Sequence, residues 1–181
     1  MSIYTCDPNL EIGGYSARSL LESETRNHYL NILERHGLSK IDRDAWYPVQ
    51  NLLGVLNDIN KRRSAMVDFI SIGLAASDNS LLPPEAQYMS FRDFFLAYGS
   101  IYPRIYRNGD PGEIQIELVE ENHLAITLID VPFPDDLIYG VLFGFACRFA
   151  NDGEQFTLDY DDQHLRRDQG GDYTIIHLTW E

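Results

Sequence analysis

The order of alternating and helical segments after residue 108 constrains this chain more than any other feature. Apolar and polar residues alternate over 114–118 and again over 124–128, with a turn at 120–122 between them. This period of two predicts a β-hairpin whose strands are buried on one face. A helix is expected to open at 132–136, and two more strands follow at 156–160 and 173–180. The C-terminal part therefore predicts an antiparallel sheet of ββαββ order.

The predicted helix after Pro132 carries Gly140 and Gly144, four residues apart. In a water-soluble protein this spacing indicates that the helix lies very close to a sheet or to another helix. Asp135 or Asp136 is expected to cap the same helix, because a carboxylate is favourable at the positive end of the helix dipole.

The first half of the chain shows helical rather than strand periodicity. Apolar residues recur at helical spacing in four segments, which we expect at 19–36, from about 47 to 59, at 65–76 and at 90–102. Residues 1–17 contain several chain breakers and are expected to be irregular. The predicted fold class is α+β, with N-terminal helices (1–107) packed on the C-terminal sheet (108–181). Residues 1–181 are expected to form a single domain.

Charge and hydropathy exclude two classes of function. The net charge is −14, so phosphate backbones would repel the chain and nucleic-acid binding is not expected. No apolar run approaches the ~20 residues of a membrane span, and the N-terminus lacks the basic and apolar regions of a signal peptide. These features predict a cytoplasmic protein.

No catalytic motif is recognisable. The sequence has no G-x-S-x-G elbow around a serine and no local signature around Cys6 or Cys147. The glycine pairs fit neither a Walker A loop nor a G-x-G-x-x-G loop. A non-enzymatic function is therefore predicted.

Metal and cofactor sites also lack a sequence signature. His28 and His36 are too far apart on one helix for a shared ion, and His177 is expected on a strand, where a structural role is favoured. Haem needs an axial ligand in an apolar pocket, for which His36 and His123 qualify by residue type alone. The prediction is no metal and no cofactor, with haem as the less favoured alternative.

Aromatic residues beside the junction of the helical half and the sheet indicate a ligand pocket. Pockets between such layers are typically lined by aromatic side chains with a few polar groups. Arg104 is expected at the mouth, where it would hold an acidic head group; pairing with one of the many carboxylates is the alternative. The predicted pocket residues are Phe91, Phe94, Phe95, Tyr98, Tyr102, Arg104 and Tyr106.

The layout resembles a family of ligand-binding α+β domains. The segments that carry the resemblance are Ile101–Arg104, the hairpin, the helix opened by 132–136 and the final strand Gly-Gly-Asp-Tyr-Thr-Ile-Ile-His-Leu-Thr-Trp. They are similar to the 4-vinyl reductase-like domains, which are grouped with the haem-NO-binding (H-NOX) domains and the TRAPP transport-complex subunits. Residues 90–181 carry most of the likeness.

Two departures from these families concern their binding sites. The cysteines that 4-vinyl reductase-like domains often carry near the C-terminal strands are absent here. H-NOX proteins hold haem with a proximal histidine and a Tyr-x-Ser-x-Arg motif. In this chain Tyr98 and Ser100 are followed by Tyr102 where the motif needs arginine.

The resemblance implies a hydrophobic-ligand sensor or an assembly module, usually dimeric. Our first hypothesis is a non-enzymatic sensor that binds a small apolar or amphipathic ligand. Because no output domain is evident, we expect it to signal through a homodimer or a partner protein. The alternatives are a ligand-free scaffold and, third, an unrecognised enzyme or a haem- or tetrapyrrole-binding protein.

Overall fold

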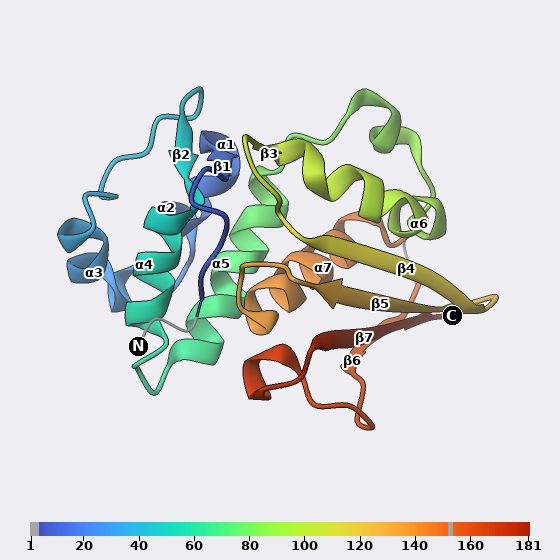
Figure 1. Ribbon diagram of the computed structural model, residues 1–181. Coiled ribbons are helices and arrows are strands. Elements are labelled where there is room, and N and C mark those ends of the chain that lie inside the picture. Colours follow the sequence, from blue (N-terminus) through green and yellow to red (C-terminus); the bar gives the residue numbers. More distant parts are fainter. Residues whose placement is uncertain (1–3, 152–153) are drawn as a thin grey trace.

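A four-stranded antiparallel sheet forms one side of the molecule. The computed structural model describes residues 4–151 and 154–181. The strands are β4 (Glu113–Glu120), β5 (His123–Ile129), β6 (Phe156–Tyr160) and β7 (Tyr173–Trp180), in the order β4-β5-β7-β6 (Figure 1). The β4–β5 hairpin is thus joined to the β6–β7 pair through the pairing of β5 with β7.

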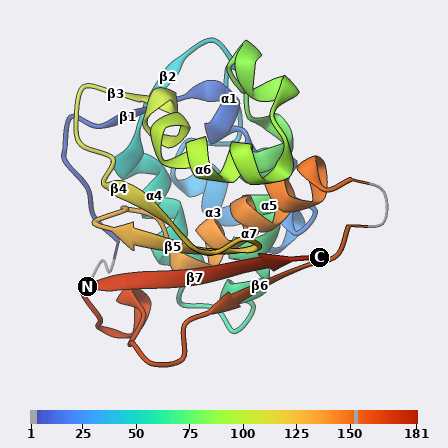
Figure 2. The same cartoon turned by 90° about the vertical axis from the view of Figure 1, so that its right-hand side faces the viewer.

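The alternation in the sequence decides which face of the sheet is buried. Leu124 and Ile126 of β5 and Ile176 and Leu178 of β7 point to the same face and are fully buried. Their chain neighbours on the opposite face stay partly exposed. Figure 2 shows that the helices gather on one side of the sheet, which is the side of these apolar residues. The predicted α+β class and the ββαββ order are confirmed.

Two long helices form the centre of the molecule. Helix α7 (Asp135–Phe149) lies against the sheet, and α5 (Ala65–Asn79) packs along α7 (Figures 1 and 2). Helix α6 (Phe91–Ile101) covers β4 and begins at Ser90, whose hydroxyl accepts a hydrogen bond from the Asp93 backbone N–H at 3.1 Å. Serine is a favoured N-cap residue because its hydroxyl can accept such a bond from a backbone N–H of the first turn.

The close approach predicted from Gly140 and Gly144 is a contact between α7 and α5. A methyl group at Gly140 would collide with the backbone carbonyl of Ile70, and one at Gly73 would collide with that of Leu137. A methyl group at Gly144 would collide with the Ser77 hydroxyl. The two helix backbones are therefore in direct contact.

The remaining N-terminal elements pack on the far side of α5. They are α1 (Gly14–Ala17), α2 (Ser19–Glu22), η1 (Arg26–His28), α3 (Leu30–Arg35) and α4 (Val49–Ile59). A small sheet of order β2-β1-β3 joins β1 (Glu11–Gly13) to β2 (Trp46–Pro48) and β3 (Tyr106–Arg107). The short 3-10 helices η2 (Pro84–Tyr88) and η3 (Tyr102–Ile105) flank α6, and η4 (Arg167–Gln169) precedes β7.

Local polar interactions explain where the N-terminal predictions are wrong. The predicted helix 19–36 is broken at Ser23, which is extended (φ −59°, ψ 138°) and whose hydroxyl lies 2.8 Å from that of Ser71. Such side-chain hydrogen bonds compete with helix continuation. The described part of segment 1–17 is not wholly irregular, because it contains β1 and α1. The second helix begins at Val49 rather than near Tyr47, since residues 46–48 pair with β1.

Within residues 4–151 and 154–181, no helix is long and apolar enough to cross a membrane.

Substituting Gly140 by alanine tests the contact between α5 and α7. We expect the Gly140→Ala variant to lose at least about 2 kcal/mol of unfolding free energy in urea, because overpacking forces two backbones apart. Gly13→Ala is the control, since its new methyl group would lie 3.8 Å from the nearest atom, an ordinary contact. Equal stability of the two variants would contradict the close packing.

Candidate ligand cavity

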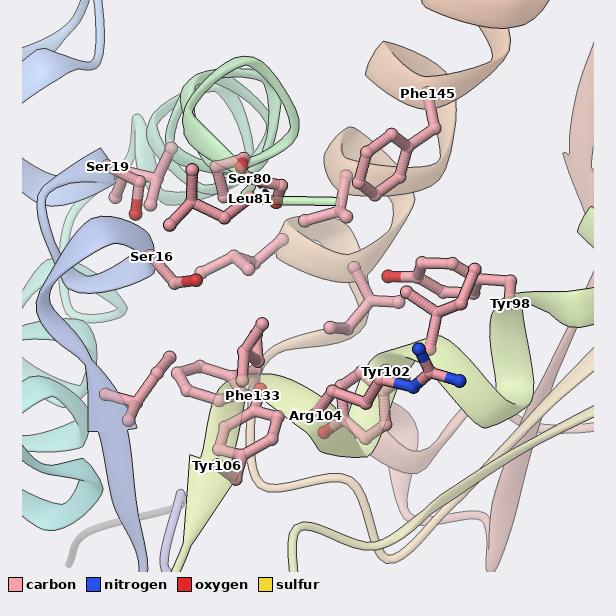
Figure 3. A pocket seen from close by; sticks show the side chains of 18 of the residues that line it. Ser16, Ser19, Ser80, Leu81, Tyr98, Tyr102, Arg104, Tyr106, Phe133 and Phe145 are labelled. Atoms are coloured by element: carbon pink, nitrogen blue, oxygen red, sulfur yellow. Dashed lines mark hydrogen bonds between the residues drawn. The ribbon is translucent and has the colours of Figure 1, made fainter. Parts of the chain in front are cut away.

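An apolar cavity of about 250 Å³, partly open to solvent, lies between the N-terminal helices and the elements that carry the sheet. Its wall combines residues of α1, α2, α4 and α5 with residues of α6, η3 and α7 (Figure 3). Aliphatic and aromatic side chains make up most of it, including Leu20, Leu56, Ile72, Leu82, Ile101, Ile105, Phe133, Ile138 and Phe145.

Helical spacing places these side chains. Leu137, Ile138, Val141 and Phe145 recur along one side of α7, and Ile72 and Ala76 are one turn apart on α5. The 3-10 turn of η3 brings Tyr102 and Tyr106 to the same wall, with ring centres 5.2 Å apart. The Tyr102 hydroxyl donates to the Pro111 carbonyl at 2.8 Å, which fixes that ring.

Three hydroxyl groups of buried residues border the cavity and have no hydrogen-bond partner among the described residues. They belong to Tyr98 (4% exposed), Ser16 (7%) and Ser19 (6%). Figure 3 shows the hydroxyls of Tyr98 and Ser16 directed into the cavity from opposite sides. Buried polar groups in folded proteins are normally paired with protein or water. The cavity wall is therefore mainly apolar, with a few hydroxyl groups that could pair with a ligand.

Burial keeps the tyrosines of the wall neutral. Desolvation raises the pKa of Tyr98, Tyr102 and Tyr106 above that of an exposed tyrosine. Each therefore presents a phenol rather than a phenolate, which donates one hydrogen bond and also accepts.

Arg104 is the one charged side chain among the described residues of the wall. Its Nη1 lies 2.9 Å from Oε1 of Glu85, and both side chains are more than half exposed. Arg104 therefore pairs with a carboxylate, which was the alternative to holding an acidic head group. The guanidinium charge is balanced before any ligand arrives.

The structure brings together four of the seven predicted pocket residues, because Tyr98, Tyr102, Arg104 and Tyr106 all line the cavity. The three phenylalanines lie outside the wall, in an aromatic cluster that adjoins it through Phe94, whose ring centre is 5.9 Å from that of Tyr98. Phe94 stacks on Phe149 with ring centres 3.9 Å apart, and Phe91 packs against Trp180 at 5.4 Å and Phe95 at 5.1 Å. They belong to the face of α6 that covers the sheet.

Sequence reasoning missed the N-terminal side of the cavity. Ile12, Ser16 and Ser19 line it, although their segment was expected to be irregular or at the edge of a helix. Ser16, Ser19 and Leu20 have the i, i+3, i+4 spacing of one helix face, which is the signal that was available. Phe133 and Phe145 also line the cavity and were predicted only as part of a helix or its entrance.

A buried ion pair holds the start of α7 and, with it, Phe133. Asp135 is fully buried, and its carboxylate accepts hydrogen bonds from Arg167 Nε at 3.0 Å, the Thr174 hydroxyl at 2.8 Å and the Asp168 backbone at 3.1 Å. Arg167 also donates to the carbonyls of Val131 and Phe133. The expected N-cap role of Asp135 or Asp136 is therefore wrong. Pro134 occupies the N-cap, and the Asp168 carboxylate accepts the Asp135 N–H at 2.9 Å.

The histidines lie away from the cavity. His36 Nε2 is 2.9 Å from Asp58, and His28 Nδ1 is 2.8 Å from Asp68. His123, His177 and His164 join Asp161 on the open face of the sheet, with His123 Nε2 2.9 Å from His177 Nδ1. Hydrogen bonds from His164 and His177 lower the pKa of Asp161 to about 2. Within the described residues, no group of histidine, cysteine and carboxylate side chains has the arrangement of a metal site.

Comparison with solved structures finds the fold of the H-NOX domains. An H-NOX structure studied for its mechanism of activation aligns with a TM-score of 0.68 at 10% identity, covering 93% of this chain and 94% of that one. An H-NOX protein from S. oneidensis in the Fe(II)NO state gives 0.68 at 13% identity, covering 94% and 99%. An oxygen-binding H-NOX domain related to soluble guanylate cyclases gives 0.67 at 11% identity, covering 93% and 92%.

The TM-scores show that the fold is shared. At 10–13% identity they do not show a shared function. The H-NOX part of the resemblance is supported, whereas likeness to 4-vinyl reductase-like domains and TRAPP subunits stays a prediction. No protein-family model matches the sequence, and the search of curated proteins found no match.

The prediction of no cofactor is contradicted by these comparisons. Similar structures come from work on haem redox potential under porphyrin distortion and on haem distortion in the H-NOX family. Haem is thus the cofactor to be expected from this fold. The sequence-based prediction was wrong because the likeness is one of layout and the arginine of the haem motif is missing after Tyr98 and Ser100.

Replacing Asp135 by asparagine tests the buried ion pair. The Asp135→Asn variant keeps the side-chain size but leaves Arg167 buried without its counter-charge, so we expect a loss of about 3–5 kcal/mol in urea unfolding. Asp162→Asn, an exposed change of the same kind, should alter stability by less than about 0.5 kcal/mol. A loss below about 1 kcal/mol in Asp135→Asn would contradict the role given to this pair.

Proposed function

We propose that this chain is a non-catalytic sensor domain whose ligand, a small and mostly apolar molecule, occupies the cavity between α5, α6 and α7. The observation that carries the proposal is the cavity itself: about 250 Å³ of apolar space bordered by three unpaired hydroxyls of buried residues, inside an H-NOX fold. Closely packed interiors rarely leave such space unused, and ligand sites combine an apolar wall with a few polar groups.

The position of the cavity supports a sensing role. An occupant would contact α1 and α5 on one side and α6, η3 and α7 on the other. Filling the space changes the packing between these layers, and differential packing is what lets a ligand shift a conformational equilibrium. Binding of the ligand therefore changes how the N-terminal helices pack against the elements that carry the sheet.

Haem, the occupant that the fold suggests, finds no ordinary axial ligand in this wall. Among the described wall residues there is no histidine, cysteine or methionine. The tyrosines could ligate iron only as phenolates, and burial raises the pKa of Tyr98, Tyr102 and Tyr106. The wall does not fit a histidine-ligated haem, so the proposal includes no step at an iron.

The Tyr-x-Ser-x-Arg spacing occurs elsewhere in the chain, at Tyr88, Ser90 and Arg92. Tyr88 is 90% exposed, Ser90 caps α6, and none of the three lines the cavity. This spacing therefore does not supply a binding site for haem carboxylates at the cavity.

We further propose that the signal passes to a second copy of the chain or to a partner protein. Exposed apolar side chains support this part of the proposal: Leu118 and Val119 at the end of β4, and Phe143 on α7. Exposed apolar groups of this kind are used in protein interfaces when they are contiguous. Sedimentation with and without a bound ligand measures whether association depends on the cavity.

Native mass spectrometry of freshly purified protein tests the ligand proposal. The wild-type chain is expected to carry a small molecule that the Ala76→Phe variant lacks, because a phenyl ring at Ala76 of α5 would fill the cavity. Ala65→Phe, the same change on the same helix but outside the wall, is the control and should retain the molecule.

Two outcomes would contradict the proposal. A wild-type protein that is empty in every preparation would favour a ligand-free scaffold. A molecule that persists in Ala76→Phe would place the ligand elsewhere.

Haem is tested in parallel by adding haemin and recording the Soret band. A stoichiometric band that is lost in Ala76→Phe would make haem the occupant in place of a small apolar molecule.

A further inference from the structure

The Tyr98 hydroxyl is the most informative polar group in the cavity. It lies at the end of a 96% buried side chain (4% exposed) and has no hydrogen-bond partner among the described residues. The ring is held by Phe145, with centres 5.6 Å apart at an interplanar angle of 61°, and by Phe94 at 5.9 Å. Packing therefore fixes the direction in which the hydroxyl points, which Figure 3 shows to be into the cavity.

A ligand that covers this hydroxyl without pairing with it takes away its access to water, which is costly, so a ligand that pairs with it is favoured. Before a ligand binds we expect water to pair with it, because about 250 Å³ is room enough for water. A ligand with an acceptor at the same place replaces that water without losing the hydrogen bond. A ligand without one leaves the donor unpaired.

We propose that the ligand is an uncharged, mainly apolar molecule with a hydrogen-bond acceptor, such as a carbonyl oxygen, that pairs with the Tyr98 hydroxyl. This inference rests on the proposed function and adds the chemical class of the ligand. The hydroxyls of Ser16 and Ser19 on the opposite wall offer a second, weaker polar contact.

The charge balance of the wall is the reason for an uncharged ligand. Arg104 is paired with Glu85 at 2.9 Å, so a carboxylate in the cavity would find no free cation among the described wall residues. Moving an ion out of water without a counter-charge is far costlier than moving a carbonyl group. Tyr98 itself contributes no charge, since burial raises its pKa above that of an exposed tyrosine.

The volume limits the size of the ligand. An apolar cavity of about 150 Å³ holds one benzene ring, so about 250 Å³ is suited to two fused rings with a short substituent. Three naphthalenes of nearly identical shape then separate the hypotheses. 2-Acetylnaphthalene carries the acceptor, 2-isopropenylnaphthalene replaces its oxygen by a methylene group, and 2-naphthoate replaces its methyl group by a charged oxygen.

Binding of the three probes by calorimetry tests the inference. We expect the ketone to bind wild-type protein roughly 3–10-fold more tightly than the alkene, which is the usual contribution of one neutral hydrogen bond. The carboxylate should bind at least about 100-fold more weakly than the ketone. Because Tyr98 stays protonated, the preference for the ketone should not change between pH 6 and pH 9.

Two variants test whether the preference for the ketone over the alkene comes from the Tyr98 hydroxyl. Tyr98→Phe keeps the ring and its packing but removes the donor, so the ketone should bind no more tightly than the alkene. Tyr88→Phe makes the same change on an exposed side chain and should keep the full preference. Alkene binding to Tyr98→Phe that is at least as tight as to wild type shows that the variant is folded and its cavity intact.

The outcomes separate this inference from the proposed function. Equal binding of ketone and alkene to wild-type protein, a preference that survives in Tyr98→Phe, or tighter binding of the carboxylate would overturn the ligand class while leaving the cavity a binding site. Failure of all three probes to bind, or equal binding to Ala76→Phe, would overturn the proposed function as well.

Discussion

The direct backbone contact between α5 and α7 is the constraint on which the rest of the structure depends. Gly73, Gly140 and Gly144 leave no side chain between the two helices. Helix α7 also carries the apolar residues that face the sheet, so this contact joins the N-terminal helices to the sheet. Side chains of α5 and α7 near the contact, such as Ala76 and Val141, border the cavity.

The buried pair of Asp135 and Arg167 complements this contact at the other end of the cavity wall. It holds the first residue of α7 and, through the carbonyls of Val131 and Phe133, the segment that enters the helix. A cavity can persist in a folded protein only when the elements around it cannot collapse into it. The glycine contact and the ion pair both hold α7, which contributes Leu137, Ile138, Val141 and Phe145 to the cavity wall.

The sequence was sufficient for the sheet, because alternation over 114–118 and 124–128 depends on local burial alone. It was also sufficient for the close approach at Gly140, where only glycine allows the distance. It failed for residues 19–36, since the break at Ser23 depends on Ser71, a contact between segments distant in the chain. For the same reason, only part of the cavity wall could be predicted from the sequence. Tyr98 and Tyr102 lie on a recognisable aromatic stripe, whereas Ser16 and Ser19 reach the cavity only through the tertiary packing of α1 and α2.

A crystal structure of the protein with 2-acetylnaphthalene tests the central claim most directly. The account predicts the two rings in the cavity lined by α5, α6 and α7, with the ketone oxygen within hydrogen-bond distance, about 2.8 Å, of the Tyr98 hydroxyl. A probe bound only on the surface, or a cavity closed by its own side chains with no space for the probe, would contradict the account.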